Sequence, residues 1–318
     1  MSRLRRGAAR LGAPGAAGVV VLALIALASV IGPWLSPYGV DQQDLLARNQ
    51  GPSWAHPFGT AELGEDVLTR VLAAGRVSLL VGLATAAAAT IVGAGLGLVA
   101  GYRGGGGDSA LSRLTDLFLI VPAFVVLIVL SLTFEQVGAA QVILILALMS
   151  WQPLFRLTRA SAMRTRELPY VQAARAAGAR GPRVVRTHLL TAAIPEIAAF
   201  AALAVGVAML AESSLSFLSL GIDPAGSASW GTLMIGAQET VEERPWLTLF
   251  PGLMILATVL AVSLIGDGLR AALGAEGGRQ AGRRWRPRPP SSRRAGCASP
   301  GPPAPSWTAS TSTSRRRR

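Results

Sequence analysis

Apolar residues along the chain gather in six long blocks, which are separated by polar segments rich in turn-forming residues. A helix of roughly 18 or more apolar residues is long enough to cross the hydrocarbon core of a bilayer. The pattern therefore predicts an all-α integral membrane protein with six transmembrane helices, at residues 17–35, 77–100, 117–134, 139–155, 191–211 and 246–269. The block at 139–155 is also typical of a buried helix in a soluble protein, but its five neighbours favour a span.

The first block follows the basic segment MSRLRRGAAR, and a cleaved signal peptide begins in the same way. The apolar part of a signal peptide is about 7–15 residues long and is followed by a cleavage site of small residues. The block at 17–35 is longer, and the sequence IGPWLSPYG at its end is a poor cleavage site. We interpret this block as a retained span and residues 1–16 as a basic N-terminal tail.

The segment between the first two blocks, residues 36–76, is polar and contains the sequence HPFGTAELGED. In its second half, apolar residues recur at the spacing of one helix face, at Leu63, Val67, Leu68, Val71 and Leu72. This spacing predicts a separate amphipathic helix that lies against the outer membrane surface before the second span.

Glycines recur every four residues in the second block, at Gly93, Gly97 and Gly101. Small residues four apart share one helix face and allow another helix to approach closely. They predict a helix-packing seam, either within the transporter or with a partner subunit. The other interpretation is the ordinary glycine content of a chain with this composition.

Arginine placement predicts the orientation of the spans. The net charge is +13, only 15% of the residues are charged, and no lysine is present. If the N-terminus is cytoplasmic, 15 of the arginines before residue 276 lie on the cytoplasmic side and 4 on the other, as the positive-inside rule requires. Both termini are therefore expected to be cytoplasmic. Contact of these loops with anionic lipid explains their charge better than nucleic-acid binding does.

Several kinds of chemistry are disfavoured by residues that the chain lacks. The single Cys297 excludes an internal disulfide and a multi-cysteine metal site, and no metal ligand set is expected. Gly104–Gly107 suggest a phosphate loop, but a P-loop needs a lysine to reach the phosphates. The two histidines, His56 and His188, both fall in loops, which argues against an enzyme active inside the membrane. These absences argue against a P-loop ATPase and against an enzyme active inside the membrane.

The few acids near the spans also bear on function, because ion-driven transporters keep ionisable residues near the middle of the membrane. Here Glu196, Glu212 and Asp267 all sit near the ends of spans. This placement weighs against an ion-gradient-driven secondary transporter, which stays the alternative function. A membrane scaffold without transport activity is a further alternative.

The loop from 156 to 188 contains a short alanine-rich helix in the sequence YVQAARAAG. Pro169 suits the first turn of a helix, and Gly178 suits the position just after its end. The alanines leave the helix slim, and it lacks the large apolar face of a helix that lies on a membrane. The pattern favours a helix that docks into a groove of another protein over one that lies flat.

At these residues the chain resembles the permease subunits of ATP-binding-cassette (ABC) importers, in the peptide and nickel branch. Their cytoplasmic EAA motif has the form E-A-A, three residues, then G, and here Ala173, Ala174 and Gly178 match while Gln172 replaces the glutamate. The continuation THLLTAAIPE resembles RHILPNxLPP, with Thr191 in place of the first proline. HPFGTAELGEDV, AESSLSFLSLGI, SWGTLM and IGDGLR resemble further motifs of the branch in the same order, with Ala61, Glu65 and Ser219 as departures. The resemblance covers about residues 15–275 and is closest to the second permease of the heterodimer.

The resemblance implies a function, partners and a coupling site, and a chain that is itself not an enzyme and binds no cofactor. Residues 17–275 would form half of the pathway for peptides or a related solute such as a nickel complex, in a bacterial cytoplasmic (inner) membrane. The partners would be a second homologous permease, two ABC ATPase subunits that use ATP and Mg²⁺, membrane lipid and an extracytoplasmic solute-binding protein. The short helix would be the coupling helix between spans four and five, with ATPase contacts at Tyr170, Gln172, Ala173, Ala174, Gly178, His188 and Leu190. The pathway-lining residues and the solute itself stay unassigned.

The C-terminal segment 276–318 is rich in proline, arginine, serine and glycine and has no periodicity, which predicts a disordered basic tail. One interpretation is a tail that binds anionic lipid. A second hypothesis is a shifted reading of DNA that encodes an adjacent ATPase, because AGCASP and APSWTASTSTS give ATPase-like strands in another frame when GC-rich codons are assumed.

Overall fold

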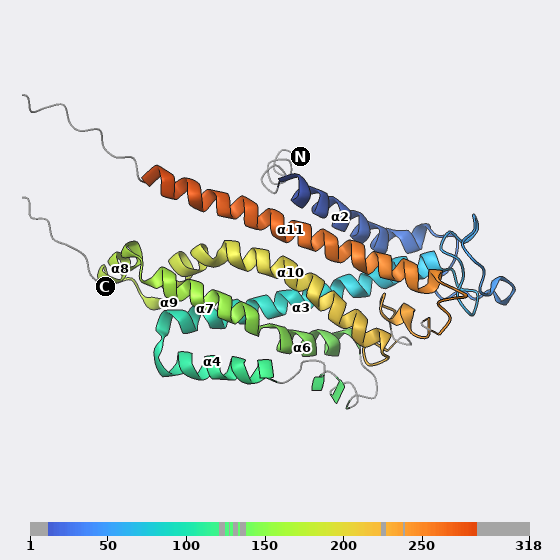
Figure 1. The fold of residues 1–318 in the computed structure, drawn as a ribbon, viewed down its shortest axis with the longest axis horizontal. Helices are drawn as coiled ribbons and strands as arrows, with labels where there is room; N and C mark the ends of the chain where they lie inside the picture. The colour runs from blue at the N-terminus through green and yellow to red at the C-terminus, as the bar shows by residue number, and fades with distance from the viewer. Residues whose placement is uncertain are drawn as a thin grey trace, which may run out of the picture. The chain divides into compact units, whose positions relative to one another are not determined.

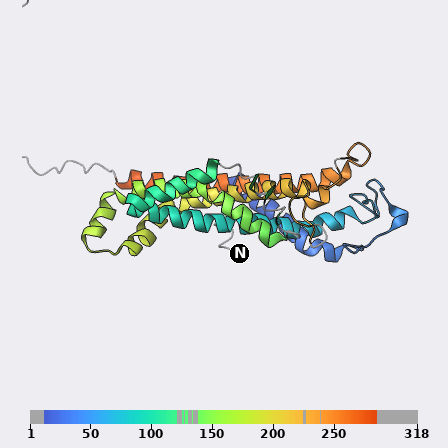
Figure 2. The same ribbon diagram turned by 90° about the horizontal axis from the view of Figure 1, so that it is seen from below.

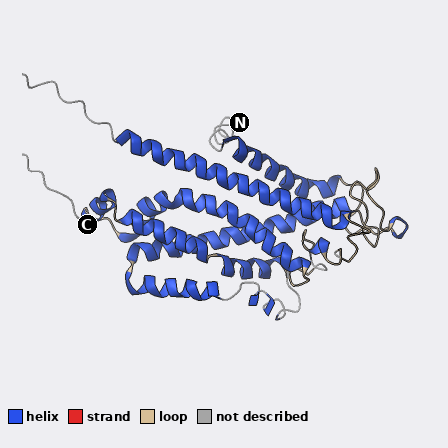
Figure 3. Cartoon of the chain, viewed as in Figure 1, coloured by secondary structure: helices blue, strands red, loops and turns tan. Residues whose placement is uncertain are grey.

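The computed structural model describes residues 12–284 except 121–124, 127, 130–132, 134–137, 224–226 and 238. Two compact units are present, Met1–Gly277 and Gly278–Arg318. The described part of the chain is helical and contains no strand, as predicted (Figure 3). The helices are α2 (Gly12–Leu35), α3 (Val67–Arg103), α4 (Gly105–Ile120), α6 (Ala139–Ser150), α7 (Gln152–Arg166), α8 (Pro169–Ala176), α9 (Gly181–Val184), α10 (Leu190–Phe217) and α11 (Trp246–Arg284), with single turns η1 (Leu45–Ala47), η2 (Val185–Leu189, a π-helix) and η3 (Thr232–Met234).

Four helices in the described residues are long and apolar enough to cross a membrane: Gly12–Leu35, Val67–Arg103, Gly181–Phe217 and Trp246–Ala272. The pair α6 and α7 makes a fifth if the two helices form one span. Four or five of the predicted spans are thus present. The predicted third span, 117–134, lies largely outside the described residues, so the count of six stays a prediction.

The predicted fourth span, 139–155, is not one straight helix. It breaks between Ser150 and Gln152, and α6 and α7 meet at an angle of 43°. Pro153, in the first turn of α7, has no backbone N–H and cannot continue the hydrogen-bond ladder of α6. The apolar periodicity did not predict this bend, because apolar residues continue on both sides of it.

α3 is the central helix and contacts α2, α6, α7 and α10 (Figure 1). It begins at Val67, where the Asp66 carboxylate accepts a hydrogen bond from the backbone N–H of Thr69 at 2.8 Å and so caps the helix. The separate amphipathic helix predicted before the second span is therefore wrong, since this stretch is the first part of α3 itself. Its apolar face is buried by protein, with Val71 and Ala74 both fully buried.

Trp230 fixes the loop after α10 against α3. Its ring is fully buried, its Nε1 donates to the Val71 carbonyl at 2.8 Å, and its backbone N–H donates to Ser78 Oγ at 3.0 Å. Gly75 makes room for the ring, because a Cβ there would lie 2.9 Å from Trp230 Cζ2. Trp230 thereby holds the segment before α11 against the N-terminal end of α3.

α2 is joined to α3 by Arg76. Pro33 inside α2 has no N–H to offer the Ser29 carbonyl, which would otherwise stay unpaired in an apolar setting. Arg76 Nε donates to that carbonyl at 2.9 Å, and Arg76 Nη2 donates to the Val30 carbonyl at 2.7 Å. One arginine thus replaces the missing ladder bond and fastens two helices together.

α4 is held to α7 by two ion pairs. Arg159 forms a bidentate pair with Asp108, in which Nε bonds Oδ1 and Nη2 donates to Oδ2 at 2.6 Å. The hydrogen bonds from Arg159 hold the pKa of the Asp108 carboxyl below its usual value, against an opposing effect of burial. Farther along, Arg156 Nη2 donates to Asp116 Oδ1 at 2.6 Å. These contacts set the position of α4 beside the tight turn at Gly104 and Gly105.

The turn that follows α10 contains a residue with unfavourable backbone geometry. Ser219 has φ = 60°, in the left-handed region where only glycine is unstrained, and the family resemblance puts a glycine there. The N–H of Ser219 donates to the Ser216 carbonyl and that of Leu220 to the Leu215 carbonyl, both at 2.9 Å, which completes the helix cap.

Replacing Ser219 with glycine is expected to raise the free energy of unfolding by about 0.5–1 kcal/mol. The relief of left-handed strain, roughly 1–2 kcal/mol, exceeds the entropy that glycine adds to the unfolded chain, about 0.5–1 kcal/mol. The midpoint of thermal unfolding in detergent measures this change. Ser214→Gly is the matched control, because Ser214 lies inside α10, where the same substitution should destabilise. A lowered midpoint for both variants would contradict the assignment of strain.

α11 continues to Arg284, so residues 276–284 are helical where the sequence predicts disorder. The rest of the predicted tail, 285–318, lies outside the described residues, and so does most of the predicted N-terminal tail.

Candidate functional site

The short helix α8 begins and ends where the sequence predicts. Pro169 is its first residue, and Gly178 has φ = 85° just beyond its end. The N–H of Gly178 donates to the Arg175 carbonyl at 3.0 Å, and the N–H of Ala179 donates to the Ala174 carbonyl at 3.1 Å. These two bonds form the cap in which a left-handed glycine closes a helix. α8 is therefore a defined structural element and not a frayed loop.

α8 is anchored in the apolar core of the bundle by one buried side chain. Val171 is fully buried, and α8 offers no other buried residue. It belongs to an apolar cluster contributed by α3, α7, α9, η2 and α10, whose other buried members are Leu98, Ala162, Val184, Leu189 and Ala193. Displacing α8 would therefore act directly on the beginning of α10 and on α7.

The opposite face of α8 is open to solvent. Tyr170 is 46% exposed, and Gln172 and Ala173 are exposed. Gln172 Nε2 donates to the Glu167 carbonyl at 3.1 Å, so this departure from the EAA motif serves as a local brace. Ala174 is half-buried, and Gly178 is exposed with no described atom within 4 Å of where its Cβ would be.

His188 and Leu190 lie beside α8 and not on its exposed face. The His188 ring meets the Tyr170 ring edge-on, with centroids 5.8 Å apart. His188 is in the π-helical turn η2, and Leu190, the first residue of α10, packs against the cluster around Val171. π-Helical turns are frequent at functional sites, because they interrupt the regular ladder of a helix.

The surface around α8 is basic. Arg175, Arg180, Arg183 and Arg186 are exposed, and no acid occurs between Glu167 and Glu196 in the sequence. Arg175 lies over the Tyr102 ring at 5.4 Å from its centroid, a cation–π contact that ties α8 to the end of α3. The site offers a partner a slim helix surrounded by guanidinium groups.

Gly93, Gly97 and Gly101 all face α7. A Cβ at Gly93 would lie 2.5 Å from the Trp151 carbonyl oxygen, and one at Gly101 would lie 2.6 Å from the Arg159 carbonyl oxygen. At Gly97 a Cβ would collide with Thr158 Oγ1 and lie 2.5 Å from the Phe155 carbonyl oxygen. The glycine face thus packs within this chain, backbone against backbone.

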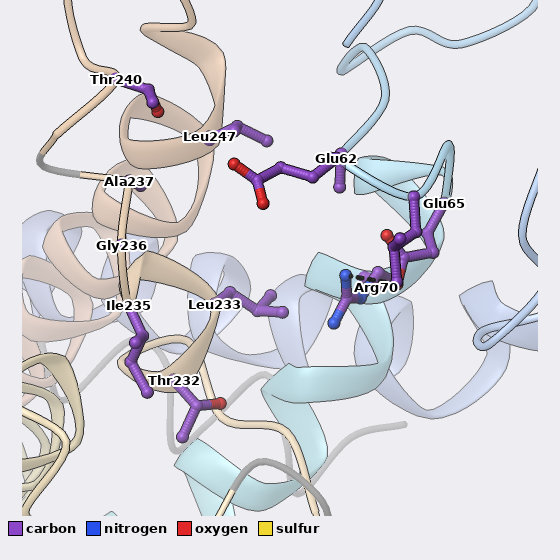
Figure 4. Close-up of a pocket in the computed structure, with 12 residues that line it drawn as sticks. Glu62, Glu65, Arg70, Thr232, Leu233, Ile235, Gly236, Ala237, Thr240 and Leu247 are labelled. Carbon is purple, nitrogen blue, oxygen red and sulfur yellow. Dashed lines mark ion pairs between the residues drawn. The ribbon is translucent and has the colours of Figure 1, made fainter. Parts of the chain in front are cut away.

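A cleft opens at the other end of the helices from α8, and we call it the distal cleft. It has a volume of about 310 Å³ and lies between residues 61–65 with Arg70 on one side and residues 232–240 with Leu247 on the other. Figure 4 shows the Glu62 carboxylate and the Arg70 guanidinium directed into it, with Leu233 and Leu247 opposite. In the sequence Glu65 stands out only as a departure from the family motif, and no local pattern there indicates a cleft.

The charged groups of the distal cleft are paired across short distances. Arg70 Nη1 lies 3.1 Å from Glu65 Oε1, and Arg244 Nη1 lies 3.2 Å from Glu62 Oε1. The Glu65 side chain is 11% exposed, whereas the Glu62 side chain is 67% exposed. The cleft is thus mixed in charge, and Glu62 is the more exposed of its two carboxylates.

Two other polar clusters near this end were also missed. His56 Nδ1 lies 3.0 Å from Asp66 Oδ1, which links the 36–66 segment to the α3 cap. Glu212 is fully buried, and its carboxylate accepts from Ser216 Oγ at 2.9 Å and from Ser213 Oγ at 3.3 Å. The serine-rich sequence around Glu212 was the available signal, since a buried carboxylate needs donors nearby.

Comparison with known proteins places the chain among membrane permeases. Residues 93–275 match the family described as "Binding-protein-dependent transport system inner membrane component", and residues 15–52 match "N-terminal TM domain of oligopeptide transport permease C". A protein named as a peptide permease of Brucella suis biovar 1 is 37% identical over 257 residues, 80% of this chain and 84% of its own length.

Two relatives with named transport systems have similar coverage. The dipeptide transport system permease protein of Bacillus subtilis is 37% identical over 258 residues, covering 81% of this chain and 80% of the relative. The glutathione transport system permease protein of Pectobacterium atrosepticum is 34% identical over 259 residues, covering 81% and 85%. Each similarity extends over both the glycine face of α3 and the α8 region.

Proposed function

The chain belongs to the family of binding-protein-dependent transport system inner membrane components, and on that premise we propose that it forms half of a peptide pathway in an ATP-driven importer. It is a membrane permease subunit, not an enzyme. Relatives named for dipeptide, glutathione and peptide transport support short peptides as the solute class. The observation that carries the proposal is α8, an exposed helix at the EAA motif that one buried valine anchors to the bundle.

We propose α8 as the contact with an ATPase subunit. Tyr170, Gln172, Ala173 and Ala174 would enter a cleft of that subunit, Gly178 would close the helix, and His188 and Leu190 would support it from behind. The small exposed side chains favour close approach, and the basic surface around them favours an acidic rim on the partner. ATP and Mg²⁺ would be bound by the ATPase, since a P-loop lysine is absent from this sequence.

Movement of α8 would reach the pathway through Val171. That side chain packs with Val184, Leu189 and Ala193, so a shift of α8 displaces the beginning of α10 as a unit. Closure of the ATPase dimer on ATP would thus bias the permease pair between two openings. Such a rigid-body switch needs only that ATP favours one of two existing arrangements.

The proposed topology has six spans and both termini in the cytoplasm. α8 and the 36–66 segment lie at opposite ends of the bundle in both views (Figures 1 and 2). With α8 in the cytoplasm, the 36–66 segment and residues 227–237 would lie outside. An extracytoplasmic binding protein would meet those segments, and a second permease would complete the pathway. The excess of arginine at the α8 end supports this orientation.

Crosslinking tests the ATPase contact. Cys297 is first replaced by serine, and Ala173→Cys is then labelled with benzophenone maleimide in the assembled complex. Illumination is expected to attach the ATPase subunit to this chain. Leu46→Cys is the matched control, because Leu46 is 94% exposed at the other end of the bundle. Equal attachment from both positions, or none from Ala173→Cys, would contradict the assignment.

A further inference from the structure

We propose that the distal cleft is a binding site for a short zwitterionic peptide, with the peptide ammonium at Glu62 and its terminal carboxylate at Arg70. This inference rests on the proposed function and adds to it a receiving site on this chain. Both charged groups point into the same cavity from the wall formed by residues 61–65 and the start of α3 (Figure 4).

Glu62 has the capacity to bind an ammonium group. Its side chain is 67% exposed, and among the described residues it has one ion pair, the 3.2 Å contact with Arg244. A carboxylate accepts about four hydrogen bonds, so the pair with Arg244 leaves room for a cationic donor. An ammonium held there would make charge-assisted bonds, which are about twice as strong as neutral ones.

Arg70 has the capacity to bind a carboxylate. Its guanidinium carries about five N–H donors, and the pair with Glu65 uses one edge of it. The Glu65 side chain is 11% exposed and partly neutralises Arg70, so a ligand with a carboxylate alone gains little attraction. A ligand that carries both charges matches a cleft in which each carboxylate is already paired with an arginine.

The remaining walls limit the ligand to a short peptide. The cavity of about 310 Å³ is at the lower end of the range, about 300–1,000 Å³, that is usual for small-molecule sites. Leu233, Ile235 and Leu247 supply apolar surface for side chains, while the Thr240 hydroxyl is available to a peptide amide.

Calorimetric titration tests the site directly. The complete complex in nanodiscs, without the binding protein, is titrated with alanyl-leucine, N-acetyl-alanyl-leucine and alanyl-leucinamide. Alanyl-leucine is expected to bind, and removing either charge should weaken binding about tenfold. No binding of alanyl-leucine, or equal binding of all three compounds, would overturn the inference.

Variants assign each charge to its residue. Glu62→Gln should weaken alanyl-leucine binding about tenfold and abolish the discrimination against the acetylated compound. The double variant Glu65→Gln/Arg70→Gln removes both members of the pair, so that no buried charge is left alone, and should abolish discrimination against the amide. Both variants are expected to assemble as the parent does, by size-exclusion chromatography.

The matched control is Glu196→Gln. Glu196 is paired with Arg164 at 3.2 Å, the same distance as in the Glu62 pair, but it lies on α10 away from the cleft. This variant should bind all three compounds as the parent does. A loss of alanyl-leucine binding in Glu196→Gln equal to that in Glu62→Gln would overturn the assignment to the cleft.

Binding and transport separate this inference from the proposed function. Peptide uptake by vesicles that contain the complete complex, ATP and binding protein tests the function. Peptide uptake without direct binding of alanyl-leucine would overturn the assignment of the cleft as a peptide site, while the proposed transport function would still hold. Direct binding that Glu62→Gln weakens supports the cleft, whatever solute the importer carries.

Discussion

Replacing Gly97 with leucine is expected to abolish accumulation of the folded subunit. The Cα of Gly97 faces α7 so closely that a Cβ would collide with Thr158 Oγ1 and lie 2.5 Å from the Phe155 carbonyl oxygen. A backbone carbonyl cannot rotate away as a side chain can, so the two helices would have to separate. Overpacking usually costs about 1–3 kcal/mol, and here we expect more than about 3 kcal/mol because α3 contacts α2, α4, α6, α7 and α10.

The yield of monodisperse protein in detergent measures this effect. Gly95→Leu is the matched control, because it lies on the same helix two residues away and no described atom is within 4 Å of its Cβ position. Gly95→Leu should accumulate normally and Gly97→Leu should not. Similar yields for the two variants would show that close contact between α3 and α7 is dispensable.

Replacing Gly178 with valine is expected to remove the stimulation of the ATPase by the loaded binding protein. A steric clash of the valine side chain is not the reason, since no described atom lies within 4 Å of the Cβ position. The reason is φ = 85°, a left-handed conformation that costs an L-residue about 1–2 kcal/mol and a β-branched residue more. The end of α8 would then adopt another conformation, and its exposed face would lose its alignment with the partner.

Gly105→Val provides the control for strain alone. Gly105 has φ = 74° with no described atom within 4 Å of its Cβ position, but it is the first residue of α4, far along the chain from α8. The two variants therefore carry similar backbone strain at different places. Stimulation should persist in Gly105→Val and be lost in Gly178→Val, with both complexes assembled. Full stimulation in Gly178→Val would remove the basis for α8 as the coupling element.

Local signals predicted α8 well. Proline at a first turn and glycine after a last turn act within a few residues, so Pro169 and Gly178 specify a short helix wherever the chain places it. The same local logic failed at α3. The change from polar to apolar residues near Val77 suggested an amphipathic helix followed by a separate span. No residue between Leu72 and Val77 ends a helix, however, and one continuous helix is present.

Other features depend on partners distant in sequence. Arg76 completes the ladder at Pro33, Trp230 bonds to Val71, and the cleft joins residues near 62 to residues near 240. No periodicity or motif spacing links such positions. Only the fold brings them within hydrogen-bond distance.

The sequence by itself determined the membrane class, most spans, the limits of α8 and the likeness to importer permeases. These follow from apolar block length, from residues that start or stop a helix, and from motif order, and each of them is local along the chain. Tertiary structure alone decided that the glycine face meets α7, that Val171 anchors α8, and that Glu62 and Arg70 share a cleft. The physical reason is that packing and charge pairing depend on distances between residues in space. The sequences of helices with similar apolar character do not specify which helices become neighbours.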